Sequence, residues 1–376
     1  MSEHKPVIGI VGSEGAYGRW LAQFFRERMG LRVLGRDPVA ADSPGERELI
    51  ERSDVLVFSA PIRRTPALIA DYVRIADGAE RGKLWLDVTS IKSPAVAAML
   101  RSQAEVAGLH PMTAPPKSPT LKGRVMVVSE ARLEGWGAWF ERFLAATEAQ
   151  CVPATPEQHD RVVALVQAMV HAAHLAQAGV IREYSAELGG LEGLLPFRTA
   201  AFEMDAAILS RILSLNPAIY EDIQFGNPYV AGMLDKLVAQ LARLRDAVGQ
   251  GDEAARASFR EGFFAENRAA LGERALADGN YNYERLGYLL ADLADAQALS
   301  VHLPEDRPGS LRALLHVFER HGISIASLHS SRTPAGEVHF RFGFDSRTEA
   351  GALLAAAVEV DSSGIGRVLE NQGTRR

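Results

Sequence analysis

The stretch that decides the fold lies at residues 7–18 and reads VIGIVGSEGAYG. An apolar run, a glycine-rich turn and a helix-compatible segment follow one another, which predicts a strand, a tight turn and a helix. Gly15 would let the backbone approach a pyrophosphate, Gly18 would let helix and strand pack closely, and the helix N-terminus would attract the anion. Ser13 follows Gly12 directly and stands where the usual fingerprint has its first glycine.

Asp37 supplies a second signal, about 20 residues past the turn and at the predicted end of the next strand. An acid there accepts hydrogen bonds from the ribose hydroxyls of a dinucleotide, and its charge repels a 2′-phosphate. We therefore expect NAD as the cofactor. Arg36 keeps NADP open, because an arginine can pair with that phosphate, and the glycines have an alternative role as turn residues only.

The composition is that of a soluble globular chain with more than one domain. Its 376 residues, 47% hydrophobic and 23% charged, exclude bulk disorder and suit two or three domains. A net charge of -6 without a long cationic run argues against nucleic acid and anionic membrane as partners. The single cysteine, Cys151, excludes an internal disulfide, and the N-terminus lacks the organisation of a signal peptide. We expect a cytoplasmic protein.

Three kinds of hydrophobic pattern follow one another along the chain. Apolar runs alternate with helix-like stretches up to about residue 150, which predicts an α/β domain of βα units on a parallel sheet, of the Rossmann type, over residues 1–152. An all-helical domain is expected over 153–295 and a small α+β module over 296–376. The strands expected in the first domain are 7–11, 31–35, 55–60, 84–88 and 125–129.

A long helix is predicted from Thr155, because Thr can cap it, proline follows and Gln158 stands at the capping-box position. Its residues 162–181 carry no formal charge, which is about the length of a bilayer span. Four polar residues fall within one arc of this helix: Gln167, His171, His174 and Gln177. We therefore expect a buried core helix with one polar stripe. Further helix ends are expected at 189–190, 216–217, 226–228 and 249–251.

Two polar segments follow later strands of the predicted sheet, where an open α/β fold places its ligand crevice. They are residues 87–93, reading DVTSIKS, and 108–112, reading GLHPM. Proline would hold His110 in extended backbone, and its imidazole could accept a proton near neutral pH. Ser90 could fix the tautomer of that ring or contact a substrate. Without other support, a His-Pro pair is more often a turn.

With these segments the chain resembles the prephenate dehydrogenases, the NAD-linked enzymes of tyrosine biosynthesis. The glycine turn, the segment around Ser90 and LHPM around His110 match the family's first domain. In the second domain, EQHD at 157–160 is followed at the family's spacing by His171, and Arg211 leads to YEDI at 220–223. The resemblance covers residues 7 to about 295.

The resemblance implies oxidation and decarboxylation of prephenate, with His110 as the proton acceptor and Ser90 as its orienting partner. Arg211 would hold a substrate carboxylate and His171 would contact the substrate, although a satisfied core histidine is the alternative for the latter. Weaker candidates are His159, as an interdomain hydrogen-bonding residue, and His174, as a packing neighbour. We expect no metal centre, because neither a carboxylate nor a cysteine accompanies the helix histidines.

The residues after Met112 read TAPPK, where the family often has a glycine and polar residues. This departure leaves arogenate, which carries an amine on its side chain, open as the substrate. Lys117 and Lys122 are candidate anion contacts. A hydroxyacid or imine reductase on the same two-domain plan, or a noncatalytic amino-acid sensor, would also be compatible with these patterns.

The third module is predicted to contain a strand at 299–303, a turn at 306–309, a helix to about 320 and strands at 324–330 and 337–344. It resembles the ACT domains, ferredoxin-like modules that sense amino acids. That resemblance implies a carboxylate site at the turn from Asp306 through Gly309 to Ser310, with tyrosine as the expected inhibitor and phenylalanine as the alternative; the module could instead be a structural appendage. The long apolar helices predict a homodimer.

Overall fold

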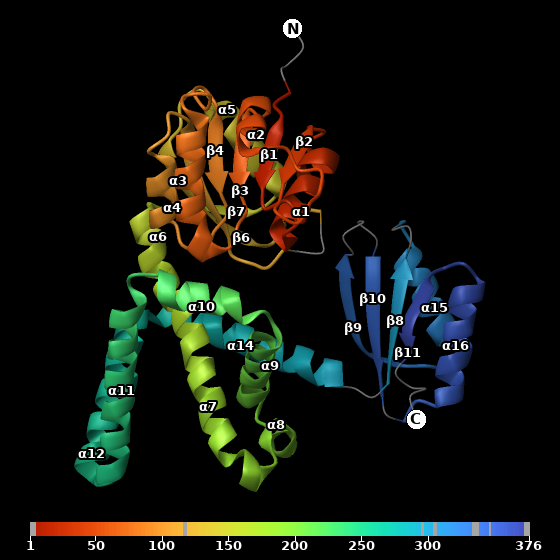
Figure 1. The fold of residues 1–376 in the computed structure, drawn as a ribbon. Coiled ribbons are helices and arrows are strands. Elements are labelled where there is room, and N and C mark those ends of the chain that lie inside the picture. The colour runs from red at the N-terminus through yellow and green to blue at the C-terminus, as the bar shows by residue number, and fades with distance from the viewer. Residues whose placement is uncertain are drawn as a thin grey trace. The chain divides into compact units, whose positions relative to one another are not determined.

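The computed structural model describes residues 5–115, 119–294, 297–303, 307–332, 338–345 and 347–371. Its internal contacts divide the chain into two compact units, Met1–Arg245 and Asp246–Arg376 (Figure 1). Each unit is described by itself. The predicted boundaries at residues 152 and 295 stay predictions.

A seven-stranded sheet forms the core of the first unit, in the order β2-β1-β3-β4-β5-β6-β7. The strands are β1 (Ile8–Val11), β2 (Val33–Arg36), β3 (Val55–Phe58), β4 (Leu84–Asp87), β5 (Glu105–Pro111), β6 (Val125–Arg132) and β7 (Gln150–Pro153). β1 lies between β2 and β3 and pairs in parallel with both, so the strand order reverses next to the glycine turn.

The predicted parallel sheet of the Rossmann type is found, with one exception at β6, which pairs antiparallel with β5. A parallel connection needs a crossover, usually a helix, and none is found among the described residues between 111 and 125. His110 also lies inside β5, opposite Val127, and not behind the strand as expected. β7 was not predicted because it is short and largely exposed.

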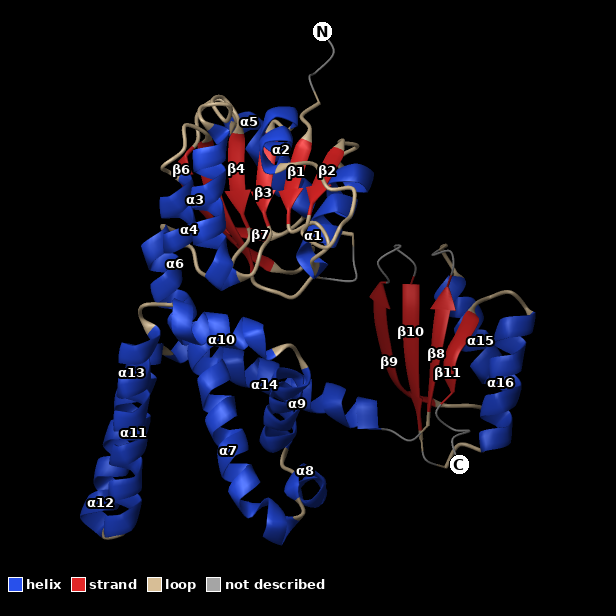
Figure 2. Cartoon of the chain, in the orientation of Figure 1, coloured by secondary structure: helices blue, strands red, loops and turns tan. Residues whose placement is uncertain are grey.

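Helices cover both faces of this sheet, which is why β1, β3 and β4 are buried at every position (Figure 2). They are α1 (Ala16–Gln23), α2 (Glu46–Arg52), α3 (Thr65–Ala76), α4 (Ser93–Met99) and α5 (Gly137–Thr147). One apolar core contains Phe25 and Phe140, and the other contains Tyr72 and Trp85.

The predicted helix start at Thr155 is confirmed, since its hydroxyl accepts a hydrogen bond from the Gln158 backbone N–H at 3.1 Å. The other predicted helix ends are found at Gly189, Asn216, Gly226 and Gln250. The helices are α6 (Pro156–Val163), a π-helical segment η3 (Ala164–Met169), α7 (Val170–Leu188), α8 (Gly190–Leu194), α9 (Ala200–Ser214), α10 (Pro217–Gly226) and α11 (Val230–Gln250).

The expectation of a buried core helix is wrong for α7, which has no buried residue in the single chain. Several of its apolar side chains are exposed among the described residues; Val180, for example, is 56% exposed. The 33 residues Pro156–Leu188 form the one helix in the described chain that is long and apolar enough to cross a membrane, by length and composition only. A single such helix is weak evidence for a membrane span.

The predicted polar stripe on η3 and α7 is present and is directed toward α9 and α10. The His174 Nε2 lies 3.4 Å from an Asp205 carboxylate oxygen. The His171 ring packs edge-on against Tyr220, with 4.7 Å between ring centroids. Polar contacts thus connect these helices to one another.

The second unit contains α12 (Glu253–Phe259), α13 (Glu266–Leu271) and α14 (Glu273–Ala294), followed by a four-stranded antiparallel sheet in the order β11-β8-β10-β9. Two helices pack on one face of this sheet, with a core that includes Val301, Phe318 and Phe342. This is the predicted ferredoxin-like arrangement. Its elements are β8 (Ala298–Leu303), α15 (Ser310–Arg320), β9 (Ile325–Arg332), β10 (Val338–Phe344), α16 (Ala350–Ser362) and β11 (Arg367–Asn371), of which the last two were not predicted.

Candidate active site

The glycine turn between β1 and α1 has the close packing that the sequence predicts. Gly12 has a φ of +84°, and a Cβ there would lie 2.3 Å from the Ser59 carbonyl oxygen. A Cβ on Gly18 would lie 2.0 Å from the Gly12 carbonyl oxygen, so only glycine lets α1 approach the turn. Gly15 precedes the first residue of α1 and leaves more room, since its Cβ would meet Gly12 at 3.3 Å.

Ser13 departs from the usual fingerprint, and the opposite strand accommodates it. The side chain is 7% exposed and lies against Gly35 on β2, where a Cβ would come within 2.7 Å of the serine hydroxyl. A glycine two residues before Asp37 was the sequence signal for this packing.

Asp37 lies beside the glycine turn, as predicted. Its carboxylate accepts hydrogen bonds from the backbone N–H groups of Glu14 at 3.0 Å and Val39 at 3.2 Å. Arg36 is directed elsewhere, because its guanidinium pairs with Glu46 and donates to the Pro44 carbonyl at 2.7 Å.

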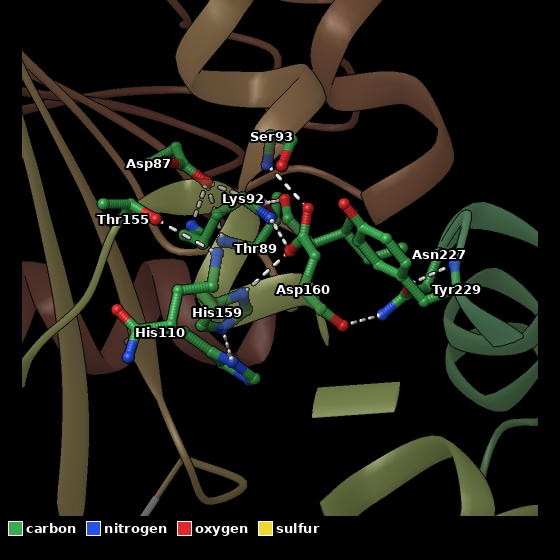
Figure 3. A network of polar contacts seen from close by, with 12 residues as sticks. Asp87, Thr89, Lys92, Ser93, His110, Thr155, His159, Asp160, Asn227 and Tyr229 are labelled. Carbon is green, nitrogen blue, oxygen red and sulfur yellow. Dashed lines mark hydrogen bonds and ion pairs between the residues drawn. The ribbon is translucent and has the colours of Figure 1, made fainter. Parts of the chain in front are cut away.

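His110 is buried in β5 and hydrogen-bonds to a second histidine. It is 3% exposed, and its Nδ1 lies 2.8 Å from Nε2 of His159, which is 2% exposed and belongs to α6 (Figure 3). The ring of His110 forms no other hydrogen bond within the described residues. Sequence reasoning rated His159 as a minor candidate, although the adjacent acid in EQHD could have signalled a longer chain of contacts.

Asp160 continues the chain, since one of its oxygens lies 2.8 Å from Nδ1 of His159. This carboxylate is fully buried and accepts hydrogen bonds from the backbone N–H groups of Lys92 at 2.8 Å and Ser93 at 2.9 Å. Burial alone would raise the pKa of Asp160, but the hydrogen bonds from His159, Ser93 and Lys92 outweigh it and lower the pKa. Asp160 is therefore ionised at neutral pH.

The ionised carboxylate sets the direction of the hydrogen bonds when both rings are neutral. Because Asp160 only accepts, Nδ1 of His159 carries a proton and, in the neutral ring, Nε2 is an acceptor. Nδ1 of His110 then donates to it, which leaves Nε2 of His110 as an unprotonated nitrogen without a partner in the described chain. This tautomer is assigned from the hydrogen-bond network. It is the form that a proton acceptor requires.

Lys92 and Asp87 form a fully buried ion pair beside these rings. The Lys92 ammonium also donates to the Leu109 carbonyl at 2.7 Å, next to His110. Gly108 makes this possible, because a Cβ there would come within 3.1 Å of the lysine chain. Burial, together with His159 and Lys92, holds the pKa of His110 well below its usual 6.5, so the ring is neutral at pH 7.

Ser90 is half-buried and forms no hydrogen bond within the described residues, where the hydrogen-bond partner of His110 is His159. The role of Ser90 as the orienting partner of His110 stays a prediction. A contact between Ser90 and a substrate stays a prediction.

Tyr17 was not predicted, yet its hydroxyl donates to the Thr113 carbonyl and connects α1 to the segment after Met112. Burial raises the pKa of this phenol.

The predicted substrate residues of the helical layer do not contact His110. Arg211 is exposed on α9 and forms no ion pair within the described chain. His171 is half-buried, and its Nδ1 has no hydrogen-bond partner in the part of the chain that the structure describes. Burial and His174 lower the pKa of His171. Lys122 is exposed, whereas Lys117 lies outside the described residues.

Two further expectations concern metal and effector sites. Among the described residues, no group of three or more His, Cys, Asp or Glu side chains is placed to hold a metal ion.

In the second unit, Gly309 has a φ of +98° and precedes α15. The Ser310 hydroxyl accepts a hydrogen bond from the Arg307 backbone N–H at 3.2 Å. Asp306 lies outside the described residues.

Comparison with known proteins places these features in context. Residues 155–263 match the family model of the prephenate dehydrogenase dimerization domain, and residues 298–357 match that of the ACT domain. In solved structures, the chain is similar to the prephenate dehydrogenase of A. aeolicus, in complex with hydroxyphenyl propionate and NAD+ (TM-score 0.56, 17% identity, 72% of this chain and 100% of that one). It is also similar to a putative prephenate dehydrogenase of Corynebacterium glutamicum (TM-score 0.54, 17% identity, 76% and 98%). These two similarities show the fold.

Curated relatives are more similar in sequence. The probable arogenate/prephenate dehydrogenase of Methanocaldococcus jannaschii is 26% identical over 274 residues, 68% of this chain and 58% of that protein. The T-protein of Enterobacter agglomerans is 26% identical over 259 residues, 67% and 65%. The chain therefore spans less than two thirds of these two relatives. The 4-amino-4-deoxyprephenate dehydrogenase of Streptomyces pristinaespiralis is 32% identical over 286 residues, 70% of this chain and 90% of that protein. With that identity over nearly the whole of a relative, the chain belongs to the prephenate dehydrogenase family.

Proposed function

We propose that this chain is an NAD-dependent dehydrogenase that oxidises and decarboxylates prephenate to 4-hydroxyphenylpyruvate. The observation that carries the proposal is the hydrogen bond between Nδ1 of the buried His110 and Nε2 of His159, which leaves Nε2 of His110 without a partner among the described residues. Burial, followed by the charges of His159 and Lys92, lowers the pKa of His110, which suits a neutral base. Family membership supplies the reaction class that such a base would serve.

Prephenate is a cyclohexadienol with a ring carboxylate, a pyruvyl side chain and a hydroxyl at C4. Its oxidation removes a proton from the C4 oxygen and a hydride from C4, and loss of CO2 makes the ring aromatic. The proton goes to a positioned base, which is the part that Nε2 of His110 fits. Aromatisation supplies the driving force.

The glycine turn fits a bound dinucleotide. Gly12 and Gly18 bring the backbone close, the N-terminus of α1 suits a pyrophosphate, and the Asp37 carboxylate suits the ribose hydroxyls. When bound, NAD accepts the hydride that leaves the substrate. Because Glu46 and the Pro44 carbonyl hold Arg36, that arginine is not placed to receive a 2′-phosphate, which supports NAD over NADP.

Binding of the substrate carboxylates is assigned to the helical layer. Arg211 is a free guanidinium within the described chain, which suits a bidentate carboxylate contact. His171 offers an Nδ1 without a partner. Ser90 adds a hydroxyl near the carboxyl end of β4.

Two other substrates have specific support. Arogenate is named with prephenate for the M. jannaschii relative, and 4-amino-4-deoxyprephenate, which has an amine in place of the C4 hydroxyl, is named for the S. pristinaespiralis relative. The deciding experiment measures kcat/KM for all three compounds, each with NAD and with NADP. We expect prephenate with NAD to give the highest value. A higher value with either amine would reassign the substrate, and no turnover of any of the three would refute the reaction class and leave a reductase or a sensor.

We further propose a cytoplasmic homodimer that tyrosine inhibits. The exposed apolar surface of α7 and the match to a dimerization domain support the dimer. The match to the ACT domain and the turn at Gly309 and Ser310 support an amino-acid effector at the N-terminus of α15.

A further inference from the structure

His110, His159 and Asp160 form a hydrogen-bonded chain of three side chains, which is more than a single base would need. Prephenate with NAD+ and the products, 4-hydroxyphenylpyruvate, CO2 and NADH, balance in charge without any released proton. A proton taken from the C4 oxygen is therefore matched by one returned to that oxygen when the ring becomes a phenol. A site closed to solvent would hold this proton until it is returned.

We propose that the two histidines store that proton, with His159 as the residue that holds it. Nε2 of His110 takes the proton from the substrate oxygen while the Nδ1 proton of His110 moves to Nε2 of His159. The positive charge then lies against the Asp160 carboxylate. The same movements in reverse return the proton to the phenolic oxygen, and this inference rests on the proposed function.

The geometry supports storage of the proton on buried side chains, away from solvent. The distance from Nδ1 of His110 to Nε2 of His159 is 2.8 Å, as is the distance from Nδ1 of His159 to the Asp160 carboxylate. His110 is 3% exposed, His159 2% and Asp160 0%. The backbone N–H groups of Lys92 and Ser93 hold the carboxylate. Such fixed donors keep the three side chains aligned without any rearrangement during the reaction.

The surrounding charges favour His159 over His110 as the residue that holds the proton, because Asp160 contacts His159 whereas Lys92 lowers the pKa of His110. Among the described residues, the charged groups that face the pair are Asp160 on α6 and the ion pair between Asp87, the last residue of β4, and Lys92 in the segment that follows (Figure 3). With both rings neutral these three groups carry one net negative charge, and a stored proton brings the cluster to neutrality. Asn227 donates to the Asp160 carbonyl at 2.8 Å and further fixes this turn of α6.

Two variants separate proton storage from mere orientation. In His159→Gln, the amide oxygen can still accept from Nδ1 of His110, so the ring stays oriented, but the amide cannot take a proton at neutral pH. In Asp160→Asn, the shape is kept and the compensating charge is lost. His316→Gln, at an exposed histidine of the second unit, is the matched control.

The first measurement uses the full-length wild-type protein without substrate. Nitrogen-15 NMR of histidine-labelled protein, with the two rings assigned through His110→Asn and His159→Gln, reads which nitrogen carries the proton. We expect a protonated Nδ1 and an unprotonated Nε2 on both rings. A proton on Nε2 of His159 would overturn the inference, because that nitrogen could then receive none.

The second measurement is turnover with whichever of the three compounds the wild type oxidises. Storage predicts that His159→Gln lowers kcat about 10-fold or more while KM and the Kd of NAD stay within about twofold, and that His316→Gln behaves as wild type. Wild-type kcat and an unchanged pH profile in His159→Gln would overturn it. If the wild type oxidises none of them, the proposed function fails, while the NMR result still decides the direction of the hydrogen bonds.

Discussion

His110 differs from an ordinary strand residue in having one nitrogen committed to a partner and one left free. Replacing it with asparagine removes the proton acceptor but keeps a polar side chain of smaller size. We expect His110→Asn to lower kcat by about 10²-fold or more and to leave the Kd of NAD nearly unchanged. Steady-state kinetics and NAD titration check this. Wild-type turnover in the variant would remove His110 from the mechanism.

The pH profile tests the same residue without a mutation. His110 works as a base only while its Nε2 is unprotonated, and burial with His159 and Lys92 lowers its pKa well below 6.5. Activity should therefore be retained as pH falls to about 6.5 and be lost only below that value. The measurement is kcat/KM against pH. A midpoint at or above 6.5 would contradict the expected environment of the ring.

At the scale of elements, the packing of α1 on β1 depends on Gly18. A Cβ there would lie 2.0 Å from a carbonyl oxygen, so Gly18→Ala must displace the helix from the turn. We expect a lower Tm and a weaker Kd for NAD, measured by thermal unfolding and by titration. Gly279→Ala is the matched control: its site on α14 has open space, and alanine should raise helix stability by about 0.5–1 kcal/mol. An equal response of both variants would contradict the close approach.

The antiparallel pairing of β5 and β6 also belongs to this scale. It aligns His110 with Val127, and the alternation along β5 puts Gly108 and His110 on one face and Leu109 in the opposite core. The missing side chain of Gly108 then gives the Lys92 chain its path to the Leu109 carbonyl. β5 therefore helps to build the site, although its sequence gives only a weak signal for a strand.

For the whole molecule, the exposed apolar surface of α7 predicts a dimer. Light scattering should give about twice the chain mass of 40.8 kDa. Val180→Lys, at a side chain that is 56% exposed, should shift the protein toward the monomer because a charge would be buried at the interface. Val39→Lys, at an 81% exposed site of the first unit, is the control. A wild-type mass near that of one chain would refute the dimer.

Regulation by tyrosine is the second prediction at this scale. An aspartate at the start of α15 would repel a bound carboxylate, so Ser310→Asp should abolish tyrosine inhibition while kcat stays unchanged. Tyrosine that instead competes at the active site would inhibit this variant as it does the wild type. Activity assays with tyrosine and with phenylalanine distinguish the two mechanisms and the two ligands.

Local signals were enough for much of this architecture. Hydrophobic runs, glycine turns and helix caps act within about ten residues. They determined the strand, turn and helix at 7–18, the helix start at Thr155 and the first four elements of the module from 298. The placement of Asp37 beside the glycine turn followed in the same way, because a strand of known direction leads to it.

Long-range packing decided the rest. The bond between His110 and His159 joins residues 49 positions apart, and it exists only because β5 runs beside β4 and α6 docks at its end. The direction of β6 and the exposure of α7 likewise depend on which neighbours are present in three dimensions, since an apolar helix has the same sequence pattern whether its own chain or a second copy covers it. Sequence thus determined the elements and their chemistry, whereas the tertiary structure decided that His159, a histidine of the helical layer, is the hydrogen-bond partner of His110.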